Sequence, residues 1–234
     1  MRLPLVILLG LGIMKGTFGQ HIPVPIVSGH PFSADEVDIE RPSPNVRNMP
    51  PKETIRVYRD SAGRTRTDAP APPNQIATHF AVINDPLAGF QYSLDLENKV
   101  ARRFGSATVA MRTVPATIQV SGADVKWYTP AITANVTTHS ELLGTEFVNG
   151  LAAAGTRVTT NRPKTPRDEE QENIRETWFS PELQMTLRIQ VFNSIMGNRT
   201  ISLENIDRAE PDPSLFRVPP QYTIVDSPAN RPTK

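Results

Sequence analysis

The clearest hydrophobic pattern in the chain is a strict alternation of apolar and polar residues from 183 to 191. A period of two is typical of a β-strand with one buried and one solvated face. The apolar side is expected to line either a packed core or a concave ligand site, and the sequence leaves both alternatives open. The candidate ligand-binding residues are therefore Leu183, Met185, Leu187, Ile189 and Val191.

Shorter runs with the same period surround this strand, and turn residues separate them. Asn149-Gly150 lies between the strand-like runs 142–148 and 151–160, and this dipeptide is the strongest short-range hairpin signal. The other expected elements are a hairpin at 53–67, a three-stranded meander at 75–104, a loop at 161–172, strands at 174–179 and 200–206, a helical turn at 212–216 and a closing segment at 218–224.

The prolines lie outside the expected strands. The chain has 23 prolines, and none falls inside the strands expected between 53 and 206, because proline cannot donate a hydrogen bond to a sheet. The domain organisation predicted from this distribution is a signal peptide (1–20), an extended Pro-rich arm (21–52), an antiparallel β domain (53–226) with an insertion of uncertain order (105–140), and a disordered tail (227–234).

Many short strands joined by hairpin turns predict a mainly β fold. Consecutive strands with short connections form an antiparallel meander. Because each strand has one apolar face, the sheet is expected to curve around a helix, its own concavity or a ligand. The expected fold is a curved antiparallel sheet, an unclosed barrel with few short helices.

The first twenty residues predict a targeting segment. Arg2 precedes the apolar run 3–14, which has the length of the hydrophobic part of a Sec-type signal peptide and is too short to span a bilayer. Small residues around Gly19 place the expected cleavage near Gly19 or Gln20. We therefore expect a periplasmic or secreted protein with no transmembrane span in the mature chain.

Charge and cysteine content exclude several function classes. Loss of Arg2 and Lys15 with the signal leaves 23 basic against 24 acidic residues, so the net charge changes from +1 to −1. Such a balance gives no electrostatic basis for binding nucleic acid. The chain has no cysteine, which excludes disulfides, thiolate metal sites and a cysteine nucleophile.

Candidate chemistry is sparse. The four histidines, at positions 21, 30, 79 and 139, lack metal-ligand spacing, and the pattern around His79 favours a solvated strand residue. Residues 60–64 (DSAGR) resemble the start of a calcium loop but lack its further carboxylates, which favours a hairpin turn. No nucleophile or phosphate-binding motif occurs, so we expect no catalytic residue, no metal and no cofactor.

Six segments together carry a family resemblance: PFSAD (31–35), VYRDSAGRTRTD (57–68), INDPLAGFQYSLDLENKVARR (83–103), LLGTEFVNGLAAAGTRVT (142–159), ETWFSPELQM (176–185) and ISLENIDRAEPDPSLFRVPPQYTI (201–224). They resemble an uncharacterised family of secreted bacterial proteins, whose general pattern is similar to the LolA/LolB superfamily of envelope lipoprotein carriers. That resemblance implies a curved, unclosed sheet over an apolar cavity, with no catalytic motif to transfer.

The sequence thus predicts a non-enzymatic periplasmic binding module. In the first hypothesis the concave sheet holds a lipid, a lipidated protein or another apolar ligand. In the second hypothesis the protein is an envelope interaction or sensing module that binds other envelope proteins through a sheet edge or the Pro-rich arm. An enzyme would require histidines clustered with carboxylates in a cleft.

Overall fold

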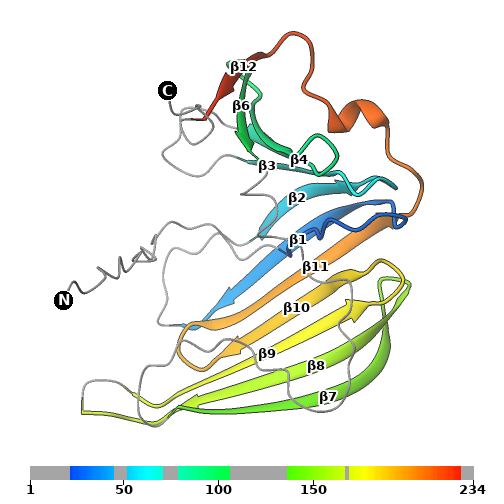
Figure 1. Ribbon diagram of the computed structural model, residues 1–234. Coiled ribbons are helices and arrows are strands. Elements are labelled where there is room, and N and C mark those ends of the chain that lie inside the picture. Colours follow the sequence, from blue (N-terminus) through cyan, green and yellow to red (C-terminus); the bar gives the residue numbers. More distant parts are fainter. Residues whose placement is uncertain (1–21, 45–51, 71–78, 106–135, 167–168, 228–234) are drawn as a thin grey trace, which may run out of the picture.

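The computed structural model describes residues 22–44, 52–70, 79–105, 136–166 and 169–227 (Figure 1). These residues form one curved sheet and a single short 3-10 helix. The elements are β1 (Phe32–Pro42), β2 (Lys52–Arg59), β3 (Thr65–Pro70), β4 (His79–Asp85), β5 (Phe90–Asp95), β6 (Val100–Gly105), β7 (Thr137–Val148), β8 (Leu151–Arg162), β9 (Gln171–Ser180), β10 (Met185–Asn193), β11 (Gly197–Asp207), η1 (Pro213–Phe216) and β12 (Thr223–Asp226).

The sheet consists of two meanders joined at one strand pair. Its order is β12-β6-β5-β4-β3-β2-β1-β11-β10-β9-β8-β7, so β1 to β6 form one half and β7 to β11 the other. All neighbours are antiparallel except β12, which runs parallel to β6. The two edge strands, β12 and β7, do not meet, and the predicted curved, unclosed antiparallel sheet is therefore confirmed (Figure 1).

Local turn chemistry explains the predicted hairpins. Asn149 and Gly150 both have positive φ, 48° and 85°, which matches the right-handed twist of the strands they connect. In the β4–β5 turn the Asp85 side chain accepts hydrogen bonds from the backbone of Leu87 and Ala88. The helical turn expected at 212–216 is η1, and the side chain of Asp212 caps it.

The assignment of residues 21–52 to an extended arm is wrong for its middle part. Residues 32–42 form β1, which pairs with β2 on one side and β11 on the other. Alternation does not reveal this strand because one of its faces is acidic: Glu36 and Asp38 are buried beside Ile55 of β2 and Ile201 of β11.

Two further ranges differ from expectation, and several lie outside the described residues. β7 begins at Thr137, within the range expected as an insertion, and the expected loop 161–172 is shorter because β8 ends at Arg162 and β9 begins at Gln171. The signal peptide, residues 106–135 of the insertion and residues 228–234 of the tail lie outside the description. No helix among the described residues is long and apolar enough to cross a membrane.

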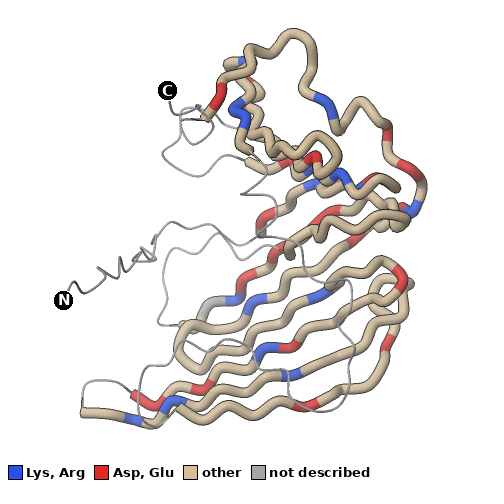
Figure 2. The backbone as a smooth tube through the Cα atoms, viewed as in Figure 1, with Lys and Arg blue, Asp and Glu red and all other residues tan. Residues whose placement is uncertain are grey.

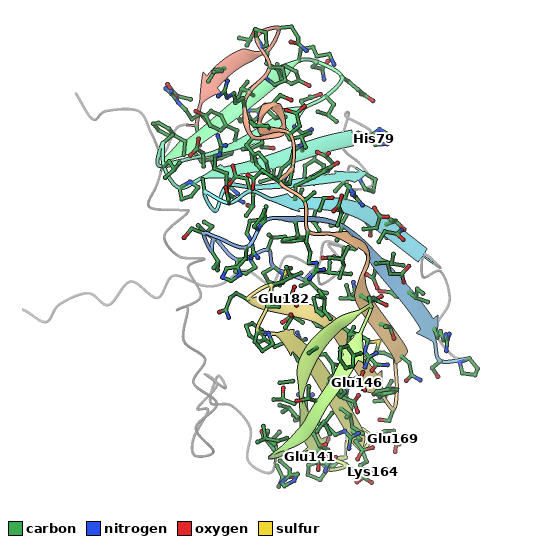
Figure 3. All side chains as sticks on the ribbon, turned by 90° about the vertical axis from the view of Figure 1, so that its right-hand side faces the viewer. His79, Glu141, Glu146, Lys164, Glu169 and Glu182 are labelled. Carbon is green, nitrogen blue, oxygen red and sulfur yellow. The ribbon has the colours of Figure 1, made fainter. Side chains whose placement is uncertain are left out.

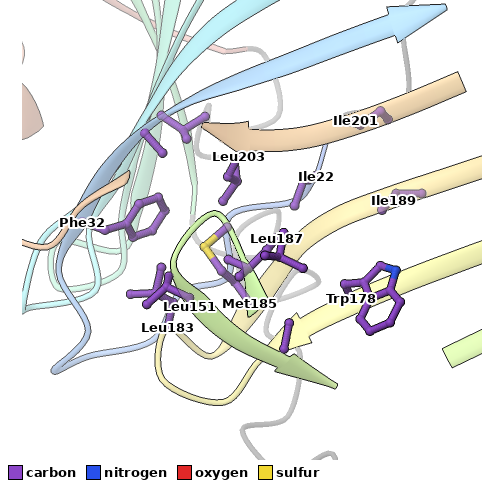
Figure 4. Close-up of a cluster of buried hydrophobic side chains, with 14 of the residues drawn as sticks. Ile22, Phe32, Leu151, Trp178, Leu183, Met185, Leu187, Ile189, Ile201 and Leu203 are labelled. Atoms are coloured by element: carbon purple, nitrogen blue, oxygen red, sulfur yellow. The ribbon is translucent and has the colours of Figure 1, made fainter. Parts of the chain in front are cut away.

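The sheet carries two apolar clusters, which lie on opposite faces where β2, β3 and β4 pair. The larger one extends from β1 and β2 to the β7–β8 hairpin, β9, β10 and β11 (Figure 4). The smaller one comprises Ala81, Ile83, Leu94 and Ala101, with Val218 and Tyr222 of the C-terminal segment packed against it. The register pairs Val57 of the larger cluster with Thr67, and Thr67 with Val82, so Ala81 and Ile83 point to the other side.

The N-terminal strap, which we define as residues 22–31, is held against the larger cluster by a buried arginine. Arg59 is fully buried and donates hydrogen bonds to the carbonyl oxygens of His30 at 2.9 Å, Pro25 at 3.3 Å and Leu183. Its guanidinium also lies over the ring of Phe32, 5.0 Å from the centroid. Burial lowers the pKa of Arg59 to about 10, so the side chain is still charged at neutral pH.

Both terminal segments meet the turn that follows Arg59. The amide of Gly29 in the strap donates to the carbonyl of Ser61 at 2.8 Å. The amide and hydroxyl of Ser61 donate to Glu210, at 3.1 and 3.2 Å. Residues 60–64, which resemble a calcium loop only superficially, therefore connect the two segments that cover opposite faces of the sheet.

Replacement of Arg59 is expected to loosen this connection. Arg59→Met keeps the length of the side chain but leaves buried carbonyl oxygens without their charged donor, so the free energy of unfolding should fall by about 3 kcal/mol. Urea denaturation measures the loss. The matched control is Arg56→Met in the same strand, where a partly exposed ion pair with Asp35 is removed and a loss below about 1 kcal/mol is expected. Equal losses in the two variants would contradict the anchoring role.

Candidate functional site

The five predicted ligand-binding residues all belong to the larger apolar cluster. Leu183 lies in the turn before β10, and the other four lie in β10 itself. Leu183, Met185, Leu187 and Ile189 are buried, whereas Val191 is half-buried against the cluster. The structure therefore places these residues in a packed interior, which is one of the two alternatives that the alternation left open.

A β-bulge divides the five residues between two faces. The register of β10 against β9 shifts between Thr186 and Arg188, so Leu187 is an extra residue in β10. Met185 is paired with Ser180 and Ile189 with Thr177, and positions 180 and 177 lie on opposite faces of β9. The alternation in the sequence therefore does not produce one continuous apolar wall.

On the face of Ile189 and Val191, apolar residues border a charged row. Arg199 is the β11 neighbour of Val191, and its Nε donates to both carboxylate oxygens of Asp38 in β1, at 2.9 and 3.1 Å. Glu40 lies 3.4 Å from the same Nε. Burial raises the pKa of Glu40 above its usual value, and the positive charge of Arg199 opposes that shift. This ionic row was not predicted, since its members come from strands that are distant in sequence.

On the other face, the β7–β8 hairpin closes over β9 and β10. Asn149 at the hairpin tip donates a side-chain hydrogen bond to the carbonyl of Leu203 in β11. Glu146 of β7 forms an ion pair with Arg188 of β10, although β8 and β9 lie between these strands in the sheet. Figure 3 shows β7 and Glu146 curled in front of the neighbouring strands. The curvature of the sheet thus makes the hairpin a cover for its own apolar surface.

We call this covered region the hairpin site. Its apolar side chains are Met185 and Trp178 on β10 and β9, and Val148, Leu151 and Ala153 on the hairpin. Its rim is the Glu146–Arg188 pair, in which the two side chains are 40% and 25% exposed. The region therefore joins a buried apolar interior to a polar, partly exposed border.

Gly155 makes the floor of the hairpin site possible. It is the β8 partner of Trp178, and a Cβ atom at this position would lie 2.6 Å from the indole ring. The same Cβ would lie 2.9 Å from the Cβ of Leu143 in β7. This close packing was not predicted; the run of small residues from 152 to 155 is the feature of the sequence that could have indicated it.

The three histidines in the described part of the chain, His30, His79 and His139, do not lie in one cluster with carboxylates. His79, labelled in Figure 3, begins β4, whereas His139 lies in β7, and the sheet order places these strands on opposite sides of the β1–β11 pair. Within the described parts of the chain, no group of three or more histidine, aspartate and glutamate side chains is placed to hold a metal ion. Basic and acidic residues are interspersed along the strands of both halves, as Figure 2 shows.

β7 exposes a long sheet edge. Eleven of its twelve residues are exposed or half-buried, and β8 is its single neighbour in the sheet order. The most exposed apolar side chains on it are Phe147, 80% exposed, and Leu142, 64% exposed. Glu141 and Glu146 lie on the same strand, and a bulge interrupts it between Leu142 and Gly144. Charges and bulges are the usual protection of an edge against uncontrolled pairing.

Comparison with known proteins finds similarity in structure alone. No family model and no curated protein matches the chain. Among solved structures, MucB, crystallised in complex with MucA(peri), has 15% identity and a TM-score of 0.41; the match covers 84% of this chain and 57% of MucB. LprF from Mycobacterium bovis has 15% identity and a TM-score of 0.34, with 79% and 90% of the two chains covered.

A LolA superfamily protein from Nitrosomonas europaea has 7% identity and a TM-score of 0.34, with 84% of this chain and 92% of that chain covered. A LolA superfamily protein is therefore among the similar structures, as are LprF and MucB. All three TM-scores lie below 0.5, so the similarity to these structures is distant.

Substitution of Gly155 is expected to disturb the hairpin site. Gly155→Ala places a methyl group inside the contact distance of the Trp178 ring and should reduce the free energy of unfolding by roughly 1–3 kcal/mol, measured by urea denaturation. The control is the same substitution in a Trp178→Leu background, where the smaller side chain should accept the methyl group and the additional loss should shrink. An equal loss in both backgrounds would show that the ring contact is not the cause.

Proposed function

We propose that the protein is a non-enzymatic binding module of the bacterial envelope that holds an apolar ligand, such as a lipid or a lipidated protein, against the curved sheet. The observation that carries the proposal is the hairpin site, where the sheet folds back over its own apolar surface. We expect a ligand to enter where the tip of the hairpin meets β11, since a side-chain hydrogen bond of Asn149 joins the two there. The expected signal-type segment at 1–20 supports an envelope location.

The proposed ligand contacts are part of the set of five residues expected from the sequence. Leu183 and Met185 offer one side of β10, Ile189 and Val191 the other, and Leu187 lies at the bulge between them. We assign the ligand to the side of Met185, because the β7–β8 hairpin covers that side and the charged row borders the other. Burial of an alkyl chain there contributes about 0.8 kcal/mol per methylene group.

The assignment predicts different effects of two adjacent leucines on ligand uptake. Leu143 packs against the cluster, whereas Leu142 points to solvent. The delipidated protein should bind an uncharged fluorescent probe, the methyl ester of a fluorescent fatty acid, and Leu143→Gln should weaken that binding about tenfold, because an amide enters an apolar contact. Leu142→Gln is the matched control and should bind as the original protein does.

One outcome would exclude this function, and a second would place the ligand elsewhere on the sheet. No uptake of the probe by the original protein would exclude the carrier role. Equal affinities of Leu143→Gln and Leu142→Gln would move the ligand away from the hairpin site, and Val191→Gln then tests the opposite side of β10. Circular dichroism spectra of all variants establish that they are folded.

A second candidate function is the binding of envelope proteins through the β7 edge. The exposed strand and the exposed Phe147 favour it, since an extended segment of a partner can add a strand to such an edge. Phe147→Ser should then remove partners from a pull-down of the full chain, whereas Leu87→Ser, equally exposed in the β4–β5 turn, should not. An unchanged partner list would exclude this role. Deletion of residues 21–52 is unsuitable as a test because it removes β1.

A further inference from the structure

Two hydrogen-bond donors in the hairpin site have no acceptor among the described residues. They are Nε1 of Trp178 and Nε of Arg188, and both atoms are buried. The two residues are direct cross-strand partners in β9 and β10, and the guanidinium lies 5.1 Å from the centroid of the indole. Trp178 itself is only 6% exposed and lies at the margin of the larger cluster (Figure 4).

Unpaired donors of this kind are costly. An indole N–H and a guanidinium Nε–H can only donate, so neither can be satisfied by turning the side chain to accept a bond. Buried donors without a partner are rare in native proteins, and each one requires an explanation. Two of them on paired residues indicate a place where an oxygen acceptor binds.

The charges at the rim define the kind of acceptor. The terminal nitrogen of Arg188 already forms an ion pair with Glu146, so the positive charge of the guanidinium is balanced. A second anionic group beside Glu146 would meet repulsion in a partly buried position. An uncharged oxygen, as in the carbonyl of an ester or amide, avoids this repulsion and still accepts from both donors.

The surroundings define what is attached to that carbonyl. Trp178 belongs to the same apolar cluster as Met185, Leu151 and Ala153, and its ring also contacts Arg188 of the polar Glu146–Arg188 rim. A carbonyl at this boundary therefore continues into an alkyl chain inward and a polar group outward. This is the chemistry of a fatty acyl ester or amide.

We propose that Trp178 Nε1 and Arg188 Nε bind the carbonyl oxygen of an acyl chain, and that the hairpin site thereby recognises acyl esters and amides rather than apolar chains in general. The inference rests on the proposed function, since it assigns the class of ligand to the same site. The acyl group can come from a glyceride or from an acylated protein, which share this carbonyl.

Two probes that differ only in the carbonyl test the proposal. Monolauroylglycerol contains an ester, and 1-O-dodecylglycerol has the same head and a chain of the same carbon number joined by an ether. We expect the delipidated full chain to bind the ester about five- to tenfold more tightly, as one or two hydrogen bonds would produce. N-lauroylethanolamine, an amide, is the third probe, and its affinity relative to the ester distinguishes a glyceride source from an acylated protein.

Conservative variants assign the difference to the two donors. Trp178→Phe keeps an aromatic ring but removes the indole N–H, and Arg188→Lys keeps a cation for Glu146 but removes Nε. Each should lower the affinity for the ester toward that for the ether and leave the affinity for the ether unchanged. A merely structural role would change the affinities of both probes together.

Nuclear magnetic resonance supplies a readout that does not depend on the Trp178 and Arg188 variants being folded, because it is recorded on a chain that keeps both residues. The chain has two tryptophans, and Trp127→Phe assigns the indole N–H signal of Trp178. The ester should move this signal downfield, and the ether should not. Equal binding of ester and ether without this movement would overturn the recognition of the carbonyl while leaving the binding module intact. Absence of binding by all three probes would overturn both proposals.

Discussion

The pairing of β1 with β11 is the interaction on which the rest of the structure depends. It connects two meanders that each form from neighbouring segments of the chain. The pair places the acidic face of β1 beside Arg199 and Ile201, and it leaves β7 and β12 as the two outer edges. Without it the strands would form two separate sheets, and the larger apolar cluster, which contains residues of both halves, would be divided.

The parts of the fold that were predicted correctly depend on local chemistry. The turns at Asn149-Gly150 and Asp85–Gly89 require particular backbone conformations or short side-chain hydrogen bonds, and these are encoded by adjacent residues. Residues 32–35 suggest at most the start of a short strand, and the full β1 was not predicted because its burial is decided by partners far away in sequence. Glu36 is polar by type, yet it is 2% exposed, and its carboxylate accepts the amide of Ile22 at 2.9 Å. Alternation cannot register a buried face made of carboxylates.

The candidate site shows the same division. Burial of the five apolar residues of the β10 region follows from their period, but their distribution over two faces does not, because one extra residue at Leu187 changes the register against β9. Arg59 illustrates the other limit. An arginine in an alternating strand predicts a solvated side chain, whereas here three carbonyl oxygens from distant segments replace the water.

The β1–β11 pair also determines when the sheet can be completed. Asp38 and Arg199 are 161 residues apart, so β1 has no partner on one side until nearly the whole chain is available. β2 to β6 are neighbours in sequence and can pair one after another. Pairing of β1 with β11 must instead close the long loop between them, which costs entropy and makes folding slow. During that interval β1 and β11 are open strand edges beside apolar residues, which is the condition under which chains associate with one another instead of folding. The chain is therefore expected to be most vulnerable to aggregation before its final third has joined its first strand.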